Sequence, residues 1–244
     1  MFADHFSTIA AGYAAFRPHY PPALADALAE RCERHELAWD AGCGNGQLSV
    51  ALAAKFARVI ATDPSQAQLD AASPHERIEY RRATAEDSGV SPNVDLAVAA
   101  QAAHWFDWPR YVAEVERVTR PGALVALVSY GIMRLDGAAG DRMTRYYRDE
   151  VGAYWPPGRH HVENGYRDLA WPWPSVAAPA IDMAATWTRD ELLGYVATWS
   201  ATVKLVQIEG PARYQALCDE LAAVWPDRER REIRWPLAIR LARR

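Results

Sequence analysis

Residues 40–47 read Asp40-Ala-Gly42-Cys-Gly44-Asn-Gly46-Gln47, and this stretch decides the fold. The residues just before it, 37–40, are mostly apolar and predict a short buried strand that ends at the glycines. The residues after it carry an apolar stripe at helical spacing, which predicts a helix. Gly42 and Gly44 lack a Cβ atom and so allow a tight turn with close approach of a ligand. The stretch therefore predicts a cofactor-binding loop at the carboxyl end of a parallel strand.

Strands and helices alternate in the chain around this loop. Strands are expected at 58–63, 78–81, 94–100 and 123–129, helices at 22–34, 65–71 and 108–119, and a terminal strand at 235–242. The run 94–100 is almost continuously apolar, which is typical of a parallel strand buried on both faces. This alternation predicts an α/β fold of the Rossmann-like, doubly wound type.

The chain is expected to form a single domain with four parts. These are an N-terminal arm (1–22), a core (23–130), a cap (131–205) and a C-terminal helix and strand (206–244). The cap is expected to be a mainly helical insertion over the sheet, with one strand near 180–187. Seven of the ten tryptophans follow residue 150, so we expect most to fill a core there and several to line a pocket.

The composition excludes several classes of protein. The 244 residues carry a formal net charge of -4, which gives the chain as a whole no attraction to nucleic acid. Cys32, Cys43 and Cys218 are widely spaced and include no CxxC pair, which argues against a disulfide framework or a structural zinc site and for a reducing cytoplasm. The first residues have neither a basic segment nor an apolar run, so we expect no signal peptide and no membrane helix.

The residues around the glycine loop indicate which cofactor it binds. An NAD-binding GxGxxG pattern would place its third glycine at position 47, where Gln47 stands. Asp40 is unfavourable beside a pyrophosphate but suits a cation, and S-adenosylmethionine (SAM) carries an ammonium and a sulfonium group. Asp63, at the end of the next strand, can accept hydrogen bonds from both ribose hydroxyls. Because NAD enzymes share this last feature, Asp63 does not discriminate between the two cofactors.

Two further segments follow the third and fourth expected strands. Ala85-Glu86-Asp87 offers an acceptor for an adenine amine. Residues 101–107 read Gln-Ala-Ala-His-Trp-Phe-Asp and bring His104 and two aromatic side chains to the carboxyl edge of the sheet. His104 is a candidate catalytic residue, and a capping or packing role is the alternative.

Together these motifs resemble class I SAM-dependent methyltransferases of the type-11 group over residues 5–130. The segments that carry the resemblance are DxGCGxGQ at 40–47, Asp63-Pro64-Ser65, AED at 85–87, QAxHWFD at 101–107 and Arg-Pro-Gly at 120–122. Residues 13–21 and 194–201 are similar to a subgroup of trans-aconitate-type small-molecule methyltransferases. The resemblance implies a seven-stranded sheet whose last strand is antiparallel.

The resemblance and the motifs nominate one set of cofactor-binding residues. They are Tyr13, Arg17, Asp40, Ala41, Gly42, Gly44, Gln47, Asp63, Pro64, Ser65, Ala85, Glu86 and Gln101. The resemblance implies that Gln101 and His104 lie near the reacting methyl group. Tyr13 and Arg17 are candidates to bind the carboxylate of SAM from an arm that folds over the cofactor.

The expected reaction is methylation of a small molecule, at an oxygen of a carboxylate or a hydroxyl. A carboxylate is already ionised near neutral pH, whereas a hydroxyl or amine needs a base, for which His104 is the candidate. An acidic acceptor needs a cation, for which Arg17 and Arg134 are candidates, with a solvated helix face as the alternative for Arg134. The candidate substrate residues are Tyr20, Trp105, Tyr130, Arg134 and Trp199.

Two other functions stay open from the sequence. Residues 227–244 hold seven arginines against three acids, which leaves a nucleic-acid methyltransferase as an alternative, although no Asn-Pro-Pro-aromatic motif is present. A SAM-binding regulatory module without catalysis is the second alternative. The partners expected are a small-molecule substrate and at most a second copy of the chain, with no nucleic acid, membrane or metal.

Overall fold

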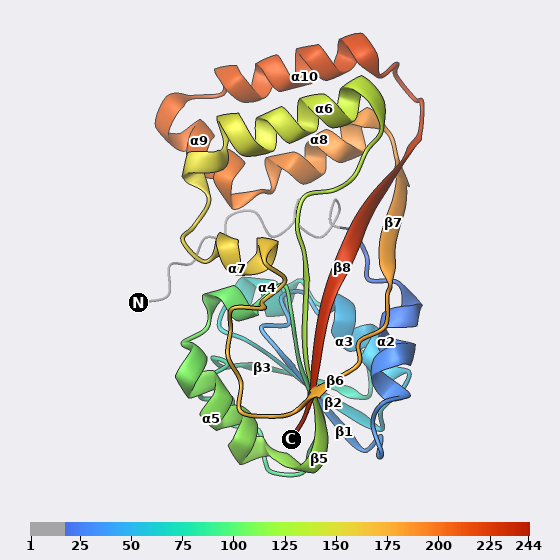
Figure 1. Ribbon diagram of the computed structural model, residues 1–244, viewed down its shortest axis with the longest axis vertical. Helices are drawn as coiled ribbons and strands as arrows, with labels where there is room; N and C mark the ends of the chain where they lie inside the picture. The colour runs from blue at the N-terminus through green and yellow to red at the C-terminus, as the bar shows by residue number, and fades with distance from the viewer. Residues whose placement is uncertain (1–17) are drawn as a thin grey trace.

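The computed structural model describes residues 18–244 and is built around one twisted sheet (Figure 1). The strands lie in the order β3-β2-β1-β4-β5-β8-β6, and β7 also pairs with β8. The first five are parallel, and β8 runs antiparallel to β5. Their bounds are β1 Leu37–Ala41, β2 Arg58–Asp63, β3 Ile78–Arg82, β4 Val94–Ala100, β5 Thr119–Tyr130, β6 Ser175–Val176, β7 Asp182–Trp187 and β8 Arg231–Arg243.

Helices cover both faces of this sheet, which confirms the doubly wound α/β prediction. The helices next to the sheet are α2 Pro22–Ala29, α3 Gln47–Ala53, α4 Gln66–Asp70 and α5 Trp108–Val118. Successive side chains of a strand point to opposite faces. Ala38 accordingly packs in the cluster that contains α2 and α3, while Trp39 packs against Tyr111 of α5 on the other face.

The strands expected near 180–187 and at 235–242 are present as β7 and β8, and the short strand β6, which was not predicted, makes the sheet eight-stranded rather than seven-stranded. β8 is 13 residues long, and β7 and β6 pair with successive parts of it. Asp182 to Trp187 lie opposite Pro236 to Arg231, and Ser175 and Val176 lie opposite Ala242 and Leu241. The last strand begins before residue 235 because β7 supplies it with backbone partners there.

The remaining helices form a layer above the carboxyl edge of the sheet (Figure 1). They are α6 Gly137–Arg145, the π-helical turn η2 Tyr146–Glu150, the short turn η3 Gly152–Tyr154, α8 Arg189–Ala197, α9 Ser200–Glu209 and α10 Ala212–Val224. The helix α7 Arg159–Glu163 lies below this layer, beside the edge of the sheet. Aromatic side chains fill this layer, among them Tyr146, Trp199, Trp225 and Trp235. α10 contributes Leu217 and Leu221 to the same cluster, so it packs with the cap helices.

Arg142, Arg145 and Arg148 recur at helical spacing in the sequence, which predicts a solvated helix face, and this prediction holds for two of the three. Arg142 is buried, because α10 covers that face of α6. Its guanidinium lies 2.7 Å from a carboxylate oxygen of Glu150 and 2.6 Å from one of Glu220. Arg145 and Arg148 are exposed as expected.

A buried carboxylate holds the amino ends of three strands together. Asp95, 1% exposed, accepts hydrogen bonds from the Glu36 and Leu37 amides and from the Arg120 guanidinium. Burial by itself would raise the pKa of Asp95, but the Arg120 and amide hydrogen bonds outweigh burial and lower it. The carboxylate is therefore charged and compensated in the folded state.

Replacing Asp95 with Ala is expected to lower the free energy of unfolding by about 3–5 kcal/mol, because the change leaves the Arg120 charge without its buried partner. The measurement is urea unfolding at neutral pH. Asp26→Ala is the control, since it removes an exposed ion pair with Lys55 and should cost less than about 1 kcal/mol. Equal losses in the two variants would contradict a special role for Asp95.

Candidate active site

The glycine loop closes tightly over the end of β2. The amides of Gly42 and Cys43 donate to the Thr62 carbonyl at 2.8 and 3.0 Å. Gly42 has a φ of +68°, and a Cβ atom added there would lie 2.6 Å from the Cβ of Ala102. No other residue fits this position without displacing the segment after β4, as the sequence predicts for a close-approach glycine.

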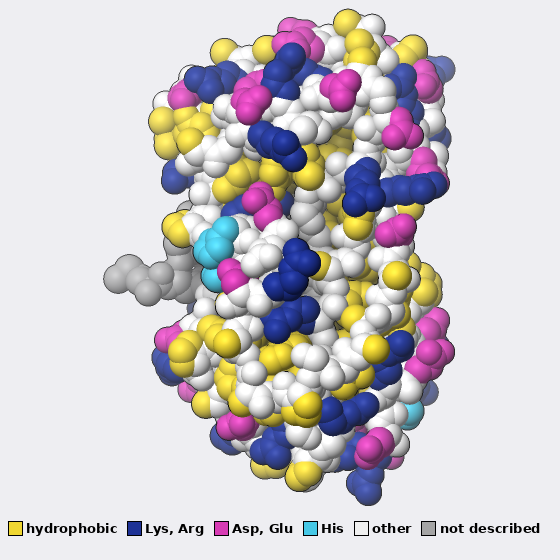
Figure 2. All heavy atoms as spheres, in the orientation of Figure 1, with side chains coloured by type: hydrophobic (Ala, Val, Ile, Leu, Met, Phe, Trp, Pro, Cys, Tyr) yellow, Lys and Arg dark blue, Asp and Glu magenta, His cyan; other side chains and the backbone are white. Residues whose placement is uncertain are grey.

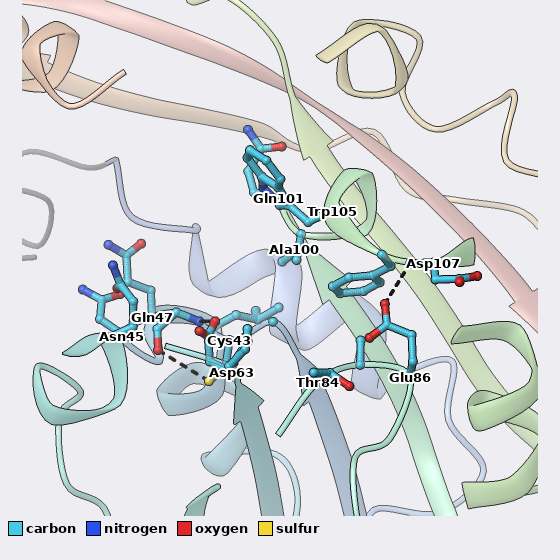
Figure 3. A pocket seen from close by; sticks show the side chains of 18 of the residues that line it. Cys43, Asn45, Gln47, Asp63, Thr84, Glu86, Ala100, Gln101, Trp105 and Asp107 are labelled. Carbon is cyan, nitrogen blue, oxygen red and sulfur yellow. Dashed lines mark hydrogen bonds between the residues drawn. The ribbon is translucent and has the colours of Figure 1, made fainter. Parts of the chain in front are cut away.

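Asp63 stands at the carboxyl end of β2 and faces the loop. One carboxylate oxygen accepts from the Gly44 amide at 2.9 Å, and the other accepts from the Ser65 amide at 2.9 Å. These two hydrogen bonds fix the direction of the carboxylate before any ligand binds. The side chain still lines the neighbouring cavity (Figure 3).

Asp40 lies beneath the loop and is 1% exposed. Its carboxylate accepts a hydrogen bond from the Ser49 hydroxyl at 2.6 Å. Burial raises the pKa of Asp40 to about 7; the Ser49 hydrogen bond opposes this rise, and the charge of Asp63 adds to it. Among residues 18–244, no basic side chain contributes to this balance, so a positive charge at the loop would favour the ionised form of Asp40.

A cavity of about 470 Å³ opens above the loop at the carboxyl ends of the parallel strands (Figure 3). Among the nominated cofactor residues, those that line it are Gly42, Gly44, Gln47, Asp63, Pro64, Ala85, Glu86 and Gln101. Asp40, Ala41 and Ser65 lie behind this lining, where they shape the loop and orient Asp63. Tyr13 and Arg17 lie outside the described residues.

Glu86 and Gln101 are both held by backbone groups. A Glu86 carboxylate oxygen accepts from the Asp107 amide at 2.8 Å, at the start of α5 (Figure 3). The Gln101 side chain donates to the Tyr130 carbonyl at 2.9 Å and accepts from the Tyr130 amide at 3.2 Å. Gln101 thereby connects the ends of β4 and β5, and its backbone has a φ of +55°.

A second, smaller cavity of about 70 Å³ continues from the first into the cap. Gln101, Trp105 and Tyr130 line both cavities, so the two adjoin at these residues. The sequence-predicted residues His104 and Trp199 also line the second cavity, and Tyr20 lines the first. The remaining wall comes from the cap and includes Tyr147, Trp155, Arg159 and Tyr195.

His104 is held on the cap side of the sheet edge, in the short turn η1 Ala103–Trp105. Its Nδ1 atom lies 2.9 Å from the hydroxyl of Tyr166, which is fully buried. Gly158 packs on the His104 backbone, where a Cβ atom would lie 2.5 Å from the carbonyl oxygen. His104 therefore belongs to the wall between the sheet and α7.

Arg134 does not join this group of residues. It is exposed, its backbone pairs with that of Arg234 on β8, and its side chain lines a separate surface hollow with Arg231. The backbone pairing with β8 carries residue 134 away from both cavities. The structure thus corrects the prediction that Arg134 faces the acceptor.

Among residues 18–244, Arg159 is the cation that lines the second cavity, and the sequence did not predict it. It follows Pro156-Pro157-Gly158 in a segment without helical or strand periodicity, so no local signal marked it.

The structure agrees with the expectation that several tryptophans line a pocket, because Trp105, Trp155 and Trp199 all line the second cavity.

Comparisons with known proteins agree with this geometry. A family model described as a methyltransferase domain matches residues 39–127. A Dictyostelium discoideum protein named as a methyltransferase is 32% identical over 211 residues, which are 84% of this chain and 80% of that one. The chain belongs to the class I SAM-dependent methyltransferases. SAM is therefore its cofactor, and the NAD alternative is excluded.

Other relatives of this methyltransferase extend the comparison. A solved structure described as a type II methyltransferase from Anaeromyxobacter dehalogenans superposes with a TM-score of 0.87 at 43% identity, over 94% of this chain and 98% of that one. The Rhizobium etli ubiquinone biosynthesis O-methyltransferase is 28% identical over 131 residues, about half of each chain. Within residues 18–244 of the methyltransferase, no helix is long and apolar enough to cross a membrane.

Replacing Asp40 with Asn is expected to stabilise the SAM-free methyltransferase while weakening SAM binding. A carboxyl whose folded pKa is raised from 3.8 to about 7 destabilises the fold progressively as pH rises between those values. The increase in the free energy of unfolding that the substitution gives should therefore grow from pH 5 to pH 7. Above pH 7 it should level off at about 4 kcal/mol.

Urea unfolding at pH 5 and pH 8 measures the stability, and calorimetric titration measures SAM affinity. In the unmodified protein SAM affinity should fall as pH drops below about 7, whereas the Asp40→Asn variant should lose most of this dependence. Glu76→Gln, which alters an exposed carboxylate, is the control. A variant that binds SAM as tightly as the unmodified protein would contradict the role of the buried charge.

Proposed function

We propose that this methyltransferase transfers the methyl group of SAM to a carboxylate oxygen of a small acceptor in the second cavity. The observation that carries the proposal is Arg159, whose side chain is 16% exposed and lines that cavity. Its guanidinium lies 4.4 Å from the centroid of the Trp155 ring and 5.4 Å from that of Tyr147. Among the described residues its ion-pair partner is Glu163 at 3.9 Å, the far end of the ion-pair range.

A guanidinium in an aromatic wall is suited to a carboxylate ligand. Arginine pairs with carboxylates through two parallel hydrogen bonds, and these bonds are stronger where water is excluded. The Nε atom of Arg159 donates to the Tyr147 hydroxyl at 2.8 Å, which holds the side chain in place. The surrounding rings of Trp155 and Trp199 favour the apolar or unsaturated body of a small acid.

The hydrogen bond between His104 and Tyr166 supports an acceptor that needs no base. Burial raises the pKa of Tyr166 far above its ordinary value, so the hydroxyl keeps its proton. A buried hydroxyl needs a hydrogen-bond acceptor. Within the described residues, Nδ1 of His104 is the acceptor for the Tyr166 hydroxyl. The neutral imidazole then carries its own proton on Nε2 and can donate a hydrogen bond, but cannot accept a proton there.

The polar groups that line the cofactor cavity suit SAM. Asp63 would accept from the ribose hydroxyls, Glu86 would lie near the adenine, and the glycine loop over Asp40 would hold the charged methionine part. SAM supplies an electrophilic methyl group: the acceptor oxygen bonds to its carbon as the carbon–sulfur bond breaks, and no proton moves. The residues shared by the two cavities would align the reactants, and such alignment is worth up to roughly 7–11 kcal/mol.

The positive charge near the C-terminus gives little support to a nucleic-acid acceptor. Arg240 and Arg243 donate to backbone carbonyls within the fold. Arg231 and Arg234 pair with neighbouring glutamates. These arginines bind groups of the chain itself, and the second cavity is small.

The name of the Rhizobium relative, an O-methyltransferase, agrees with an oxygen acceptor. The finer trans-aconitate-type resemblance stays a prediction.

Arg159→Met is expected to raise the KM for a carboxylic acid substrate by about 10–100-fold, the effect of losing a charged hydrogen-bonded partner. SAM affinity should not change, since Arg159 does not line the first cavity. The measurement is methyl transfer to a panel of small carboxylic acids, phenols and amines. Arg167→Met, an exposed arginine a few residues away, is the control. Turnover of phenols or amines but of no carboxylic acid would overturn the proposal.

His104→Gln is expected to raise KM with a smaller change in kcat, because an amide still donates a hydrogen bond and no base is lost. At saturating SAM, kcat should be flat between pH 7 and pH 9. A fall in kcat of about 10²–10⁴-fold, the usual effect of losing a general base, would instead assign His104 that role.

The Tyr166→Phe variant tests the tautomer assigned to His104. In nitrogen NMR of labelled histidine, the His104 ring should be an Nε2–H tautomer in the unmodified protein and a mixture in the variant. An Nδ1–H tautomer in the unmodified protein would contradict the assignment.

A further inference from the structure

Residues 156–169, here the α7 segment, form one wall of the second cavity. The segment places Arg159 in that cavity and Tyr166 against His104. Val162, Tyr166 and Leu169 pack it onto the cluster beside the sheet. Its outer surface carries side chains that neither the cofactor site nor the acceptor site uses.

Two histidines and one carboxylate converge on that outer surface. Nδ1 of His161 lies 2.7 Å from Oδ2 of Asp168, and Nε2 of His160 lies 3.5 Å from the same oxygen. The two imidazole rings are 3.8 Å apart between centroids. One potential ligand atom from each residue lies within 4.8 Å of the other two. Within residues 18–244, these three residues are the group of histidine, cysteine or acidic side chains that lie close enough together to share a metal ion. Figure 2 shows histidine and acidic side chains together over α7.

The surroundings of these residues resemble those of a metal site. Nδ1 of His160 lies 2.6 Å from the Pro157 carbonyl oxygen, so this nitrogen carries the proton and Nε2 keeps its lone pair. The ion-pair contacts of Asp168 among the described residues are with these two histidines.

We propose that His160, His161 and Asp168 bind a divalent transition metal ion, and Zn²⁺ is the ion that the ligand set fits best. Two imidazole nitrogens and one carboxylate oxygen are ordinary zinc ligands at about 2.0–2.2 Å, with a fourth position for water. Tetrahedral geometry at those lengths separates ligand atoms by roughly 3.3 Å. The present separations of 2.7 and 3.5 Å to the Asp168 oxygen need shifts of less than about 1 Å.

The ion has a route to the site and a defined effect on the fold. The His160 side chain is 63% exposed, so the site opens directly to solvent. A bound ion would join α7 to the turn that follows it, which contains Asp168, and so restrain Arg159 at the start of α7 and Tyr166 in that turn. The expected consequence is a more rigid acceptor wall with no change at the glycine loop. This consequence rests on the proposed function, whereas metal binding does not.

The test is calorimetric titration of the EDTA-treated, SAM-free full-length protein with Zn²⁺. One equivalent is expected to bind, and His161→Ala and Asp168→Asn should each weaken binding at least tenfold. His75→Ala, which removes a half-buried histidine that is not part of the cluster, is the matched control and should bind Zn²⁺ as the unmodified protein does. Circular dichroism before metal addition verifies that each variant is folded.

A second readout is independent of catalysis. With Co²⁺ in place of Zn²⁺, the unmodified protein should show a visible absorption band that both ligand variants lack. Hydrogen exchange should slow across residues 156–169 when Zn²⁺ is added and remain unchanged at 40–47. Absence of binding, or unchanged binding in His161→Ala and Asp168→Asn, would overturn the proposal. Either result would leave the carboxylate acceptor proposal standing.

Discussion

Parallel pairing of β1 with β2 and β4 is the constraint on which the rest of the molecule depends. Asp40 lies opposite Ala61 on one side and Val98 on the other, so the three strands end at one edge. The amides of Gly42 and Cys43 continue this pairing by binding the Thr62 carbonyl. The cofactor cavity therefore lies where the strands stop, and the side chains that follow each strand face it.

Two buried aspartates of this sheet differ in whether the fold compensates their charge. Asp95, at the amino ends of the strands, has Arg120 and two amides as partners and is a compensated charge. Asp40, at the carboxyl ends, has one hydroxyl partner, that of Ser49, and burial raises its pKa. The first arrangement stabilises the folded chain by itself. The second costs free energy until a cation binds, which is typical of a ligand-binding site.

The cap turns an open cofactor site into a pair of adjoining cavities. Gln101 binds both backbone groups of Tyr130 and so fixes the boundary between the two. Gly158 packs directly on the His104 carbonyl and so holds the start of α7 against the sheet edge beside the second cavity. Any acceptor in the second cavity must therefore contact cap and sheet together, and the chemistry of the cap decides which acceptors fit.

The sequence by itself determined the α/β order, the glycine loop and the placing of Asp63 and Gln101 at one edge, because periodicity and turn residues are local signals and parallel strands share an edge. Only the tertiary structure decided which arginine lines the second cavity and which is buried. The spacing of Arg142 shows its helix face, but not that α10 and Glu220 cover that face. Likewise, Arg159 has no local pattern, and it enters the cavity because α7 packs against the distant His104.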